Sequence, residues 1–217
     1  MVRTYNSAET RKALLTAATD VIRAKGYTAT TVDEICTAAG VTKGGFFHHF
    51  DSKEELGVAA VEHFNARADE LFGAAAYQAK ADPRERIFGY LDLRIAMLHG
   101  DIAKYTCLIG TTVQEVYATH PALRQTCDRM LSEHVALLTR DLAAAKELHA
   151  PEASWTPESV GYFMQCVLQG GFIFAKAQQN PKVAAASLGH LRAYLVTVLG
   201  QPSTTRPANS KRKERRR

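Results

Sequence analysis

Residues 26–56 read GYTATTVDEICTAAGVTKGGFFHHFDSKEEL, and this stretch decides the fold. Thr31 followed by Glu34 is a capping box, in which the two side chains satisfy free backbone N–H groups and start a short helix. Gly40 follows that helix at a position that needs a positive φ. Thr42 is the expected N-cap of a second short helix, which carries the segment GGFFHH. Two short helices joined by such a tight turn predict a helix-turn-helix, whose second helix enters the major groove of DNA.

The rest of the chain is also helical in pattern. Apolar residues recur at spacings of three and four, and no Asn-Gly or Asp-Gly hairpin signal is present. Ser52 followed by Glu55 is a second capping box, which opens a long helix. Helices are expected at about 7–25, 31–40, 42–49, 52–79, 82–100, 108–118, 121–148, 157–179 and 182–199, with a short piece near Ala103. The sequence therefore predicts an all-α protein with a three-helix unit in residues 1–52, a larger helical unit in residues 53–200 and a disordered basic tail in residues 201–217.

The net charge of +5 belongs to the C-terminal end and not to the helical units. Residues 201–217 carry a net charge of +6, and the first 200 residues carry −1. Residues 1–60 hold seven basic and seven acidic side chains. Affinity for DNA must therefore come from the placement of individual residues and from dimerisation, while the tail either adds phosphate contacts or is a solvated end.

Composition and motifs exclude several classes of protein. Apolar residues make up 46% of the chain, but no run reaches the roughly 18 that would span a membrane, and no apolar signal core is present near Met1. We therefore expect a cytoplasmic protein with no membrane partner. The four cysteines are scattered without a CxxC pair, so we expect no disulfide, no metal site and no cofactor. Phosphate-binding loops and the motifs HExxH and GxSxG are absent, and we expect no catalysis.

The first quarter of the chain resembles the TetR family of bacterial repressors, over about residues 7–60. The resemblance is carried by Gly-Tyr-x-x-Thr-Thr at 26–31, Ala-Gly-Val-x-Lys-Gly at 39–44, aromatic-His-x-Phe at 47–50 and Ser-Lys-Glu-Glu-Leu at 52–56. The remaining helices resemble the family in length and order. The resemblance implies a helix-turn-helix DNA-binding domain followed by a helical domain for ligand binding and dimerisation.

The resemblance also implies which residues contact DNA, and elementary chemistry agrees. Hydroxyls at helix N-termini and lysines suit phosphates, while glycines allow a helix to approach the bases closely. The expected DNA-binding residues are Thr31, Thr42, Lys43, Gly44, Gly45, Phe47, His48, His49 and Lys53. The two lysines can alternatively be plain solvated charges. Phe47 either contacts a thymine methyl or packs in part, whereas Phe46 and Phe50 are expected in the core.

Two positions depart from the family pattern. The family often has a polar residue where Gly45 stands and a tyrosine where Phe47 stands. Both changes remove hydrogen-bonding groups from the second helix of the motif. We therefore expect less direct base readout from this helix, with His49 or segments outside the helix carrying more of the specificity.

The resemblance further implies a dimer and a ligand cavity in residues 53–200. Helices at about 121–148 and 157–180 are expected to pair with their mates, with Gly161, Gly170 and Gly171 allowing close approach. An isologous dimer places two reading helices about one DNA turn apart, which predicts a palindromic operator.

Ligand-binding candidates combine aromatic, sulfur and isolated polar side chains on apolar helix faces, a lining that suits a small, mostly apolar compound. They are Phe64, Tyr90, Arg94, Cys107, Gln114, Tyr117, Met130, His134, Phe163, Gln165, Cys166 and Gln169. Each is alternatively a core residue. Arg94 either holds an anionic ligand or pairs with an internal carboxylate such as Glu115.

These expectations combine into one function and two alternatives. The function is a transcriptional repressor that a small-molecule effector releases from double-stranded DNA. One alternative is a repressor that senses electrophiles or oxidants through Cys107, because a helix N-terminus lowers the pKa of a thiol. The other is an architectural DNA-binding protein that ignores ligands.

Overall fold

The computed structural model describes residues 6–201, which contain ten α-helices, one 3-10 helix and no strand. The helices are α1 (Ser7–Lys25), α2 (Val32–Ala39), α3 (Lys43–Phe47), α4 (Lys53–Gly73), η1 (Ala76–Ala79), α5 (Pro83–Ala96), α6 (Ile102–Tyr105), α7 (Leu108–Val116), α8 (Pro121–His149), α9 (Pro157–Gln178) and α10 (Lys182–Leu199). The predicted all-α fold is confirmed. The basic tail predicted in residues 201–217 lies outside the described residues from position 202 onward.

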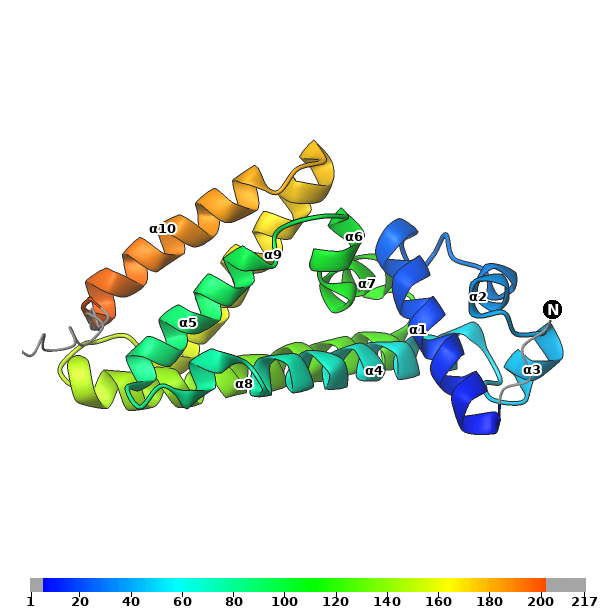
Figure 1. The fold of residues 1–217 in the computed structure, drawn as a ribbon, viewed down its shortest axis with the longest axis horizontal. Helices are drawn as coiled ribbons and strands as arrows, with labels where there is room; N and C mark the ends of the chain where they lie inside the picture. Colours follow the sequence, from blue (N-terminus) through cyan, green and yellow to red (C-terminus); the bar gives the residue numbers. More distant parts are fainter. Residues whose placement is uncertain (1–5, 202–217) are drawn as a thin grey trace, which may run out of the picture.

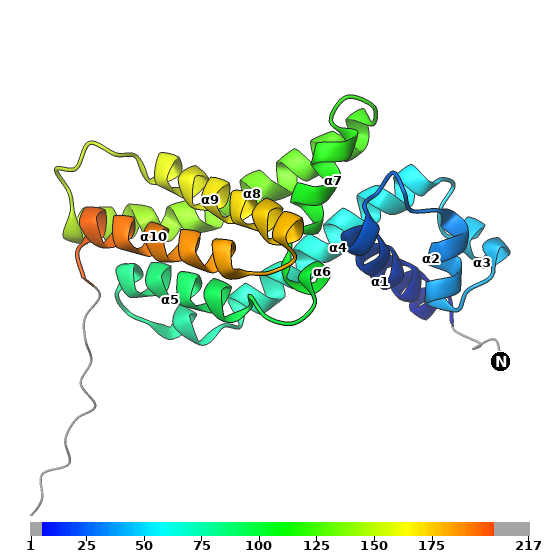
Figure 2. The ribbon, with the colours of Figure 1, turned by 90° about the horizontal axis from the view of Figure 1, so that it is seen from above.

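The molecule is elongated, with α1–α3 at one end of its long axis (Figure 1). Helices α4 and α8 pack along each other and form one long side, while α5, α9 and α10 complete a triangular arrangement at the other end. Figure 2 shows α9 and α10 side by side on one face. Helices α6 and α7 lie between this larger unit and α1, so they join the two ends of the molecule.

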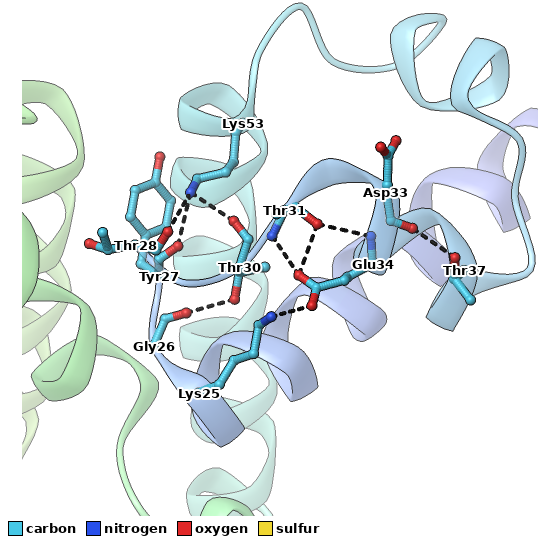
Figure 3. Close-up of polar contacts among 10 residues, drawn as sticks. All are labelled: Lys25, Gly26, Tyr27, Thr28, Thr30, Thr31, Asp33, Glu34, Thr37 and Lys53. Atoms are coloured by element: carbon cyan, nitrogen blue, oxygen red, sulfur yellow. Dashed lines mark hydrogen bonds and ion pairs between the residues drawn. The ribbon is translucent and has the colours of Figure 1, made fainter.

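The caps predicted in the N-terminal unit are confirmed. The Thr31 side chain accepts from the Glu34 N–H, and the Glu34 carboxylate accepts from the Thr31 N–H at 2.8 Å (Figure 3). Gly40 ends α2 with φ 66°, a left-handed conformation that costs glycine little. Thr42 caps α3, which is shorter than predicted because the chain turns at Phe47 to bury Phe50.

The helix that follows differs from prediction at both ends. Ser52 accepts from the Glu55 N–H, but the Glu55 carboxylate accepts from the Asp51 N–H at 2.7 Å, so the reciprocal half of the expected capping box is wrong. The helix ends at Gly73 and not near residue 79. The 3-10 turn after it packs on α5, where Tyr77 covers a glycine of that helix, and a continuous α4 could not make this contact.

The core consists of two clusters. The first joins α1–α3 to the first half of α4, to α7 and to the start of α8, and it contains the buried Phe46 and Phe50, as expected. The second joins α5, α9 and α10 to the last half of α8. The first cluster therefore crosses the boundary that the sequence suggests between residues 52 and 53.

Residues 6–201 contain no candidate membrane span and no candidate metal site. No helix there is both long and apolar enough to cross a membrane. No group of three or more metal-ligating side chains is present in the same part of the chain. The four cysteines are free thiols.

Candidate DNA-reading surface and ligand cavity

The helix α3 presents an open surface at the end of the molecule. Thr42, Lys43, Gly44 and His48 are exposed, and 52% of the Phe47 side chain is accessible. Phe47 rests edge-on against the buried ring of Phe46, with the ring centroids 5.1 Å apart. The structure therefore leaves Phe47 available for contact from outside and does not pack it into the core.

The two glycines of α3 differ. A Cβ at Gly44 would meet nothing closer than the Thr42 Oγ1 at 4.0 Å. A Cβ at Gly45 would lie 2.9 Å from Cγ1 of Val41, which is tighter than real side chains allow. A side chain at position 45 would therefore disturb the packing of the turn, whereas the space beside Gly44 is open.

The polar residues at the helix starts are partly occupied. The Thr42 hydroxyl accepts from the Gly45 N–H at 3.1 Å, and the Thr31 hydroxyl donates to the Glu34 carboxylate at 2.9 Å. The Lys43 ammonium lies 2.9 Å from the Asp33 carboxylate, and this hydrogen bond and charge raise the pKa of Lys43. Because both side chains of this pair are well exposed, the pair is weak and a phosphate can replace it.

The lysine at position 53 does not point toward the reading surface. Its ammonium donates to the carbonyl oxygens of Tyr27 at 3.0 Å and Thr30 at 2.8 Å, and it lies 4.4 Å from the centroid of the Tyr27 ring (Figure 3). Burial is the main cause that lowers the pKa of Lys53, and Glu115 opposes it. In this structure the lysine closes the loop between α1 and α2, which is an alternative to the expected phosphate contact.

The histidines after α3 contact each other, with the rings of His48 and His49 5.0 Å apart. His48 is exposed and His49 half-buried. Burial, followed by the charge of His48 and that of Arg11, lowers the pKa of His49. The neutral ring can therefore donate to DNA without adding charge near neutral pH.

A cavity of about 420 Å³ opens between α1, α4, α5, α6, α7, α8 and α9. Of the expected ligand-binding residues, it is lined by Phe64, Arg94, Cys107, Met130, His134, Gln165 and Gln169. Tyr90 is buried behind the wall and reaches it through hydrogen bonds to Arg94, His134 and Gln165 at 3.0, 2.9 and 3.2 Å. The volume lies in the range of small-molecule sites.

Four expected ligand residues lie elsewhere. Gln114 lines a smaller cavity of about 260 Å³ beside α7, which shares Cys107 with the first. Tyr117 is 68% exposed at the end of α7. Phe163 and Cys166 face outward, over a groove between α9 and α10. Helical periodicity placed all four on apolar faces, but these faces meet solvent and not the cavity.

Several cationic residues at this cavity were not predicted from the sequence. Arg23, Arg67 and Lys104 line it together with Arg94, whereas Asp20 is the sole carboxylate on its lining. Arg23 lies at the end of α1, in the unit expected to bind DNA. Its distance from Arg94 along the sequence does not indicate that both side chains line the same cavity. Only the fold brings them together.

Two contacts tie α1 to the α6–α7 segment. Arg23 donates through Nη2 to the carbonyls of Lys104 and Thr106, the latter at 2.9 Å. The Glu115 carboxylate accepts from the N–H groups of Tyr27 at 3.3 Å and Thr28 at 2.7 Å. The alternative that Arg94 pairs with Glu115 is therefore wrong, because the Glu115 carboxylate binds the loop after α1.

The outer face of α9 and α10 is apolar. Its large exposed side chains are Tyr162, Phe163, Ile173, Phe174 and Tyr194 (Figure 2 shows the two helices). Gly170 is open on this face, but Gly161 packs against α8 and Gly171 against Ala184 of α10. The expected use of Gly161 and Gly171 between subunits is thus corrected, because both allow close packing within the chain.

Comparison with known proteins agrees with this architecture. A family described as bacterial regulatory proteins, tetR family, matches residues 14–60. A second, described as tetracyclin repressor-like, C-terminal domain, matches residues 83–191, about half of the chain. The HTH-type transcriptional repressor NemR of Escherichia coli (strain K12) is 25% identical over 89% of this chain and 97% of its own. The transcriptional regulator AcuR of Cereibacter sphaeroides is 29% identical over 78% of each.

A solved structure described as the reduced form of E. coli NemR superposes with a TM-score of 0.73. It is 25% identical and covers 85% of this chain and 96% of its own.

Proposed function

The chain belongs to the TetR family of DNA-binding transcriptional regulators, and on that premise we propose that it is a ligand-responsive repressor. It acts as a dimer that binds a palindromic operator through α3, and a small molecule in the cavity releases it. The observation that supports this most is the placement of the open α3 surface at one end of the molecule and of a cavity lined in part by α1. The α6–α7 segment, bonded to α1, links the two.

The operator contacts fall on the residues that the structure leaves open. Lys43 and the N-terminus of α3 at Thr42 approach phosphates, and Phe47 approaches a thymine methyl. Gly44 allows the close approach. With little hydrogen bonding from α3, His48 and His49 carry a larger part of the readout.

The second copy is expected to dock on the apolar face of α9 and α10. The sequence predicted that helices 121–148 and 157–180 pair with their mates. We expect α10 in place of the first of these helices, because α8 packs its apolar side chains against α4, α5, α7 and α9 of the same chain. Phe174→Glu should convert the dimer to a monomer in sedimentation velocity. Leu148→Glu, at an exposed leucine of α8, is the matched control and should leave the dimer intact.

Footprinting on the DNA upstream of the gene, at stated salt, tests the DNA-binding part. Wild type should protect a discrete palindrome, and a Thr42→Ala, Lys43→Ala, Phe47→Ala variant should lose it. A matched variant replaces the exposed Tyr117 and Lys182 by alanine and should keep the footprint. Diffuse protection that survives the triple variant would instead favour an architectural DNA-binding protein.

A second candidate is release by a thiol reaction at Cys107, with α7 as the responding element. The Cys107 side chain caps α7, its Sγ accepts from the Gly110 N–H at 3.4 Å, and it lines both cavities. Arg23 shares the lining of the larger cavity with Cys107, and Lys176 shares that of the smaller one. N-ethylmaleimide, which the thiolate attacks at its double bond, should then release DNA from wild type and from Cys166→Ser but not from Cys107→Ser. Release from Cys107→Ser as well would exclude this candidate.

A further inference from the structure

Arg94 is a positioned cation without a counterion. Its Nε donates to the Tyr90 hydroxyl at 3.0 Å, and its guanidinium lies over the ring of Phe72, 4.5 Å from the centroid. Within residues 6–201 no carboxylate is at ion-pair distance from it, and its two terminal nitrogens have no protein hydrogen-bond partner. Because the side chain lines the cavity, these donors are open to a molecule bound there.

The neighbouring polar groups do not neutralise this charge. The Tyr90 oxygen accepts from Arg94 and from Gln165, so its own proton goes to Nε2 of His134 at 2.9 Å. His134 is therefore neutral, with its proton on Nδ1. Burial first, and then the charge of Arg94, lowers the pKa of His134 to about 4. The network fixes the arginine and leaves its positive charge intact.

The rest of the lining favours an anion with an apolar body. Arg23, Arg67 and Lys104 add positive charge against the one carboxylate of Asp20. The walls beyond Arg94 are aromatic and sulfur-containing: Phe64, Phe72, Met97, Met130 and Phe172. A cavity of about 420 Å³ with such walls excludes large or strongly hydrated ligands.

We propose that the effector of this protein is a small amphipathic monocarboxylate, whose carboxylate binds the open edge of Arg94 and whose apolar body packs between the phenylalanine and methionine side chains. This inference rests on the proposed function and specifies the chemistry of its ligand. A carboxylate fits better than a phosphate ester because its two oxygens match the open edge of the planar Arg94 guanidinium in a bidentate pair.

The test measures binding to the full-length protein without DNA, by calorimetry and thermal shift. The probes are phenylacetate, hydrocinnamate and octanoate, each against its primary amide, which has nearly the same shape but no charge. At least one carboxylate should bind and raise the melting temperature, and its amide should bind roughly 10- to 100-fold more weakly. Equal binding of acid and amide, or binding of no carboxylate, would overturn the proposal.

Variants tie the effect to this arginine. Arg94→Met should weaken the carboxylate by a factor of about ten or more and leave the amide unchanged. Arg192→Met is the matched control, since that guanidinium also lies over a ring, Phe88 at 4.8 Å, but outside the cavity. Arg94→Lys keeps the charge and should bind with intermediate strength, which guards against misfolding of the methionine variant. Undiminished carboxylate binding in folded Arg94→Met would refute the assignment.

The operator footprint separates this inference from the proposed function. A protein that protects its operator but responds only to neutral compounds keeps the repressor function and loses the carboxylate. A protein that binds carboxylates at Arg94 but protects no DNA keeps the site and loses the repressor function.

Discussion

Gly26 is the position where a single methyl group should disturb both halves of the molecule. It has φ 93° and ψ 161°, a region essentially restricted to glycine, and an alanine there costs about 1–3 kcal/mol. Its Cβ would also overlap the Glu115 carboxylate, which must then leave the N–H groups of Tyr27 and Thr28. Two partly exposed hydrogen bonds of this kind contribute about 1–2 kcal/mol together. We therefore expect Gly26→Ala to lower the free energy of unfolding by about 2–5 kcal/mol.

Equilibrium urea unfolding at fixed protein concentration measures this loss. Gly100→Ala is the matched control, because Gly100 also has a positive φ of 75° but nothing lies within 4 Å of its added Cβ. The control should show the backbone cost alone.

A double-mutant cycle then isolates the contact. Glu115→Ala should lower the free energy of unfolding by about 1–2 kcal/mol in the wild-type background. In the Gly26→Ala background it should have almost no effect, because the carboxylate is already displaced. Equal costs in the two backgrounds would refute the reasoning that Gly26 is required by the approach of α7.

Three further outcomes are expected. Lys53→Met should destabilise the fold by about 2 kcal/mol but leave the salt dependence of operator binding unchanged, whereas loss of a phosphate contact would reduce the logarithmic slope by about 1. Thr42→Ala should cost about 1 kcal/mol in urea unfolding, because the Gly45 N–H loses its acceptor. His134 has a pKa of about 4 in the fold and about 6.5 unfolded, so the unfolded chain binds more protons between these values and stability should fall as pH falls from about 6.5 to about 4. The total loss is about 3 kcal/mol, and a His134→Gln variant should show a flatter profile over that window in pH-dependent urea unfolding.

The features that the sequence predicted well are those that neighbours in the chain decide. A cap needs only the residues three positions apart, so Thr31 with Glu34 and the left-handed Gly40 could be placed from the sequence. The second capping box failed in its finer half, because a carboxylate three residues into a helix can equally reach the residue before the cap, as Glu55 does with Asp51.

The features that sequence could not place depend on partners far along the chain. A lysine after a helix-turn-helix suits phosphate, but Lys53 meets carbonyls more than twenty residues earlier. Phe64 stands among polar residues and Phe163 among apolar ones, yet Phe64 lines the cavity and Phe163 faces outward. Periodicity identifies the faces of a helix but not what each face meets, and α9 contacts α5, α7, α8, α10 and solvent.

The contacts around α7 connect the ligand cavity to the DNA-binding helices. The cavity wall includes Thr106 and Cys107, and the carbonyl of Thr106 accepts from Arg23 of α1. Eight residues beyond Cys107, Glu115 holds the loop that leads into α2. Any ligand that binds better when α6 and α7 are displaced must therefore also shift α1, and the shift can be transmitted to α4 through the core they share. In the proposed dimer, two α3 helices fit one operator at a fixed spacing, so a small rotation of α1–α4 in each subunit would be enough to lose the fit.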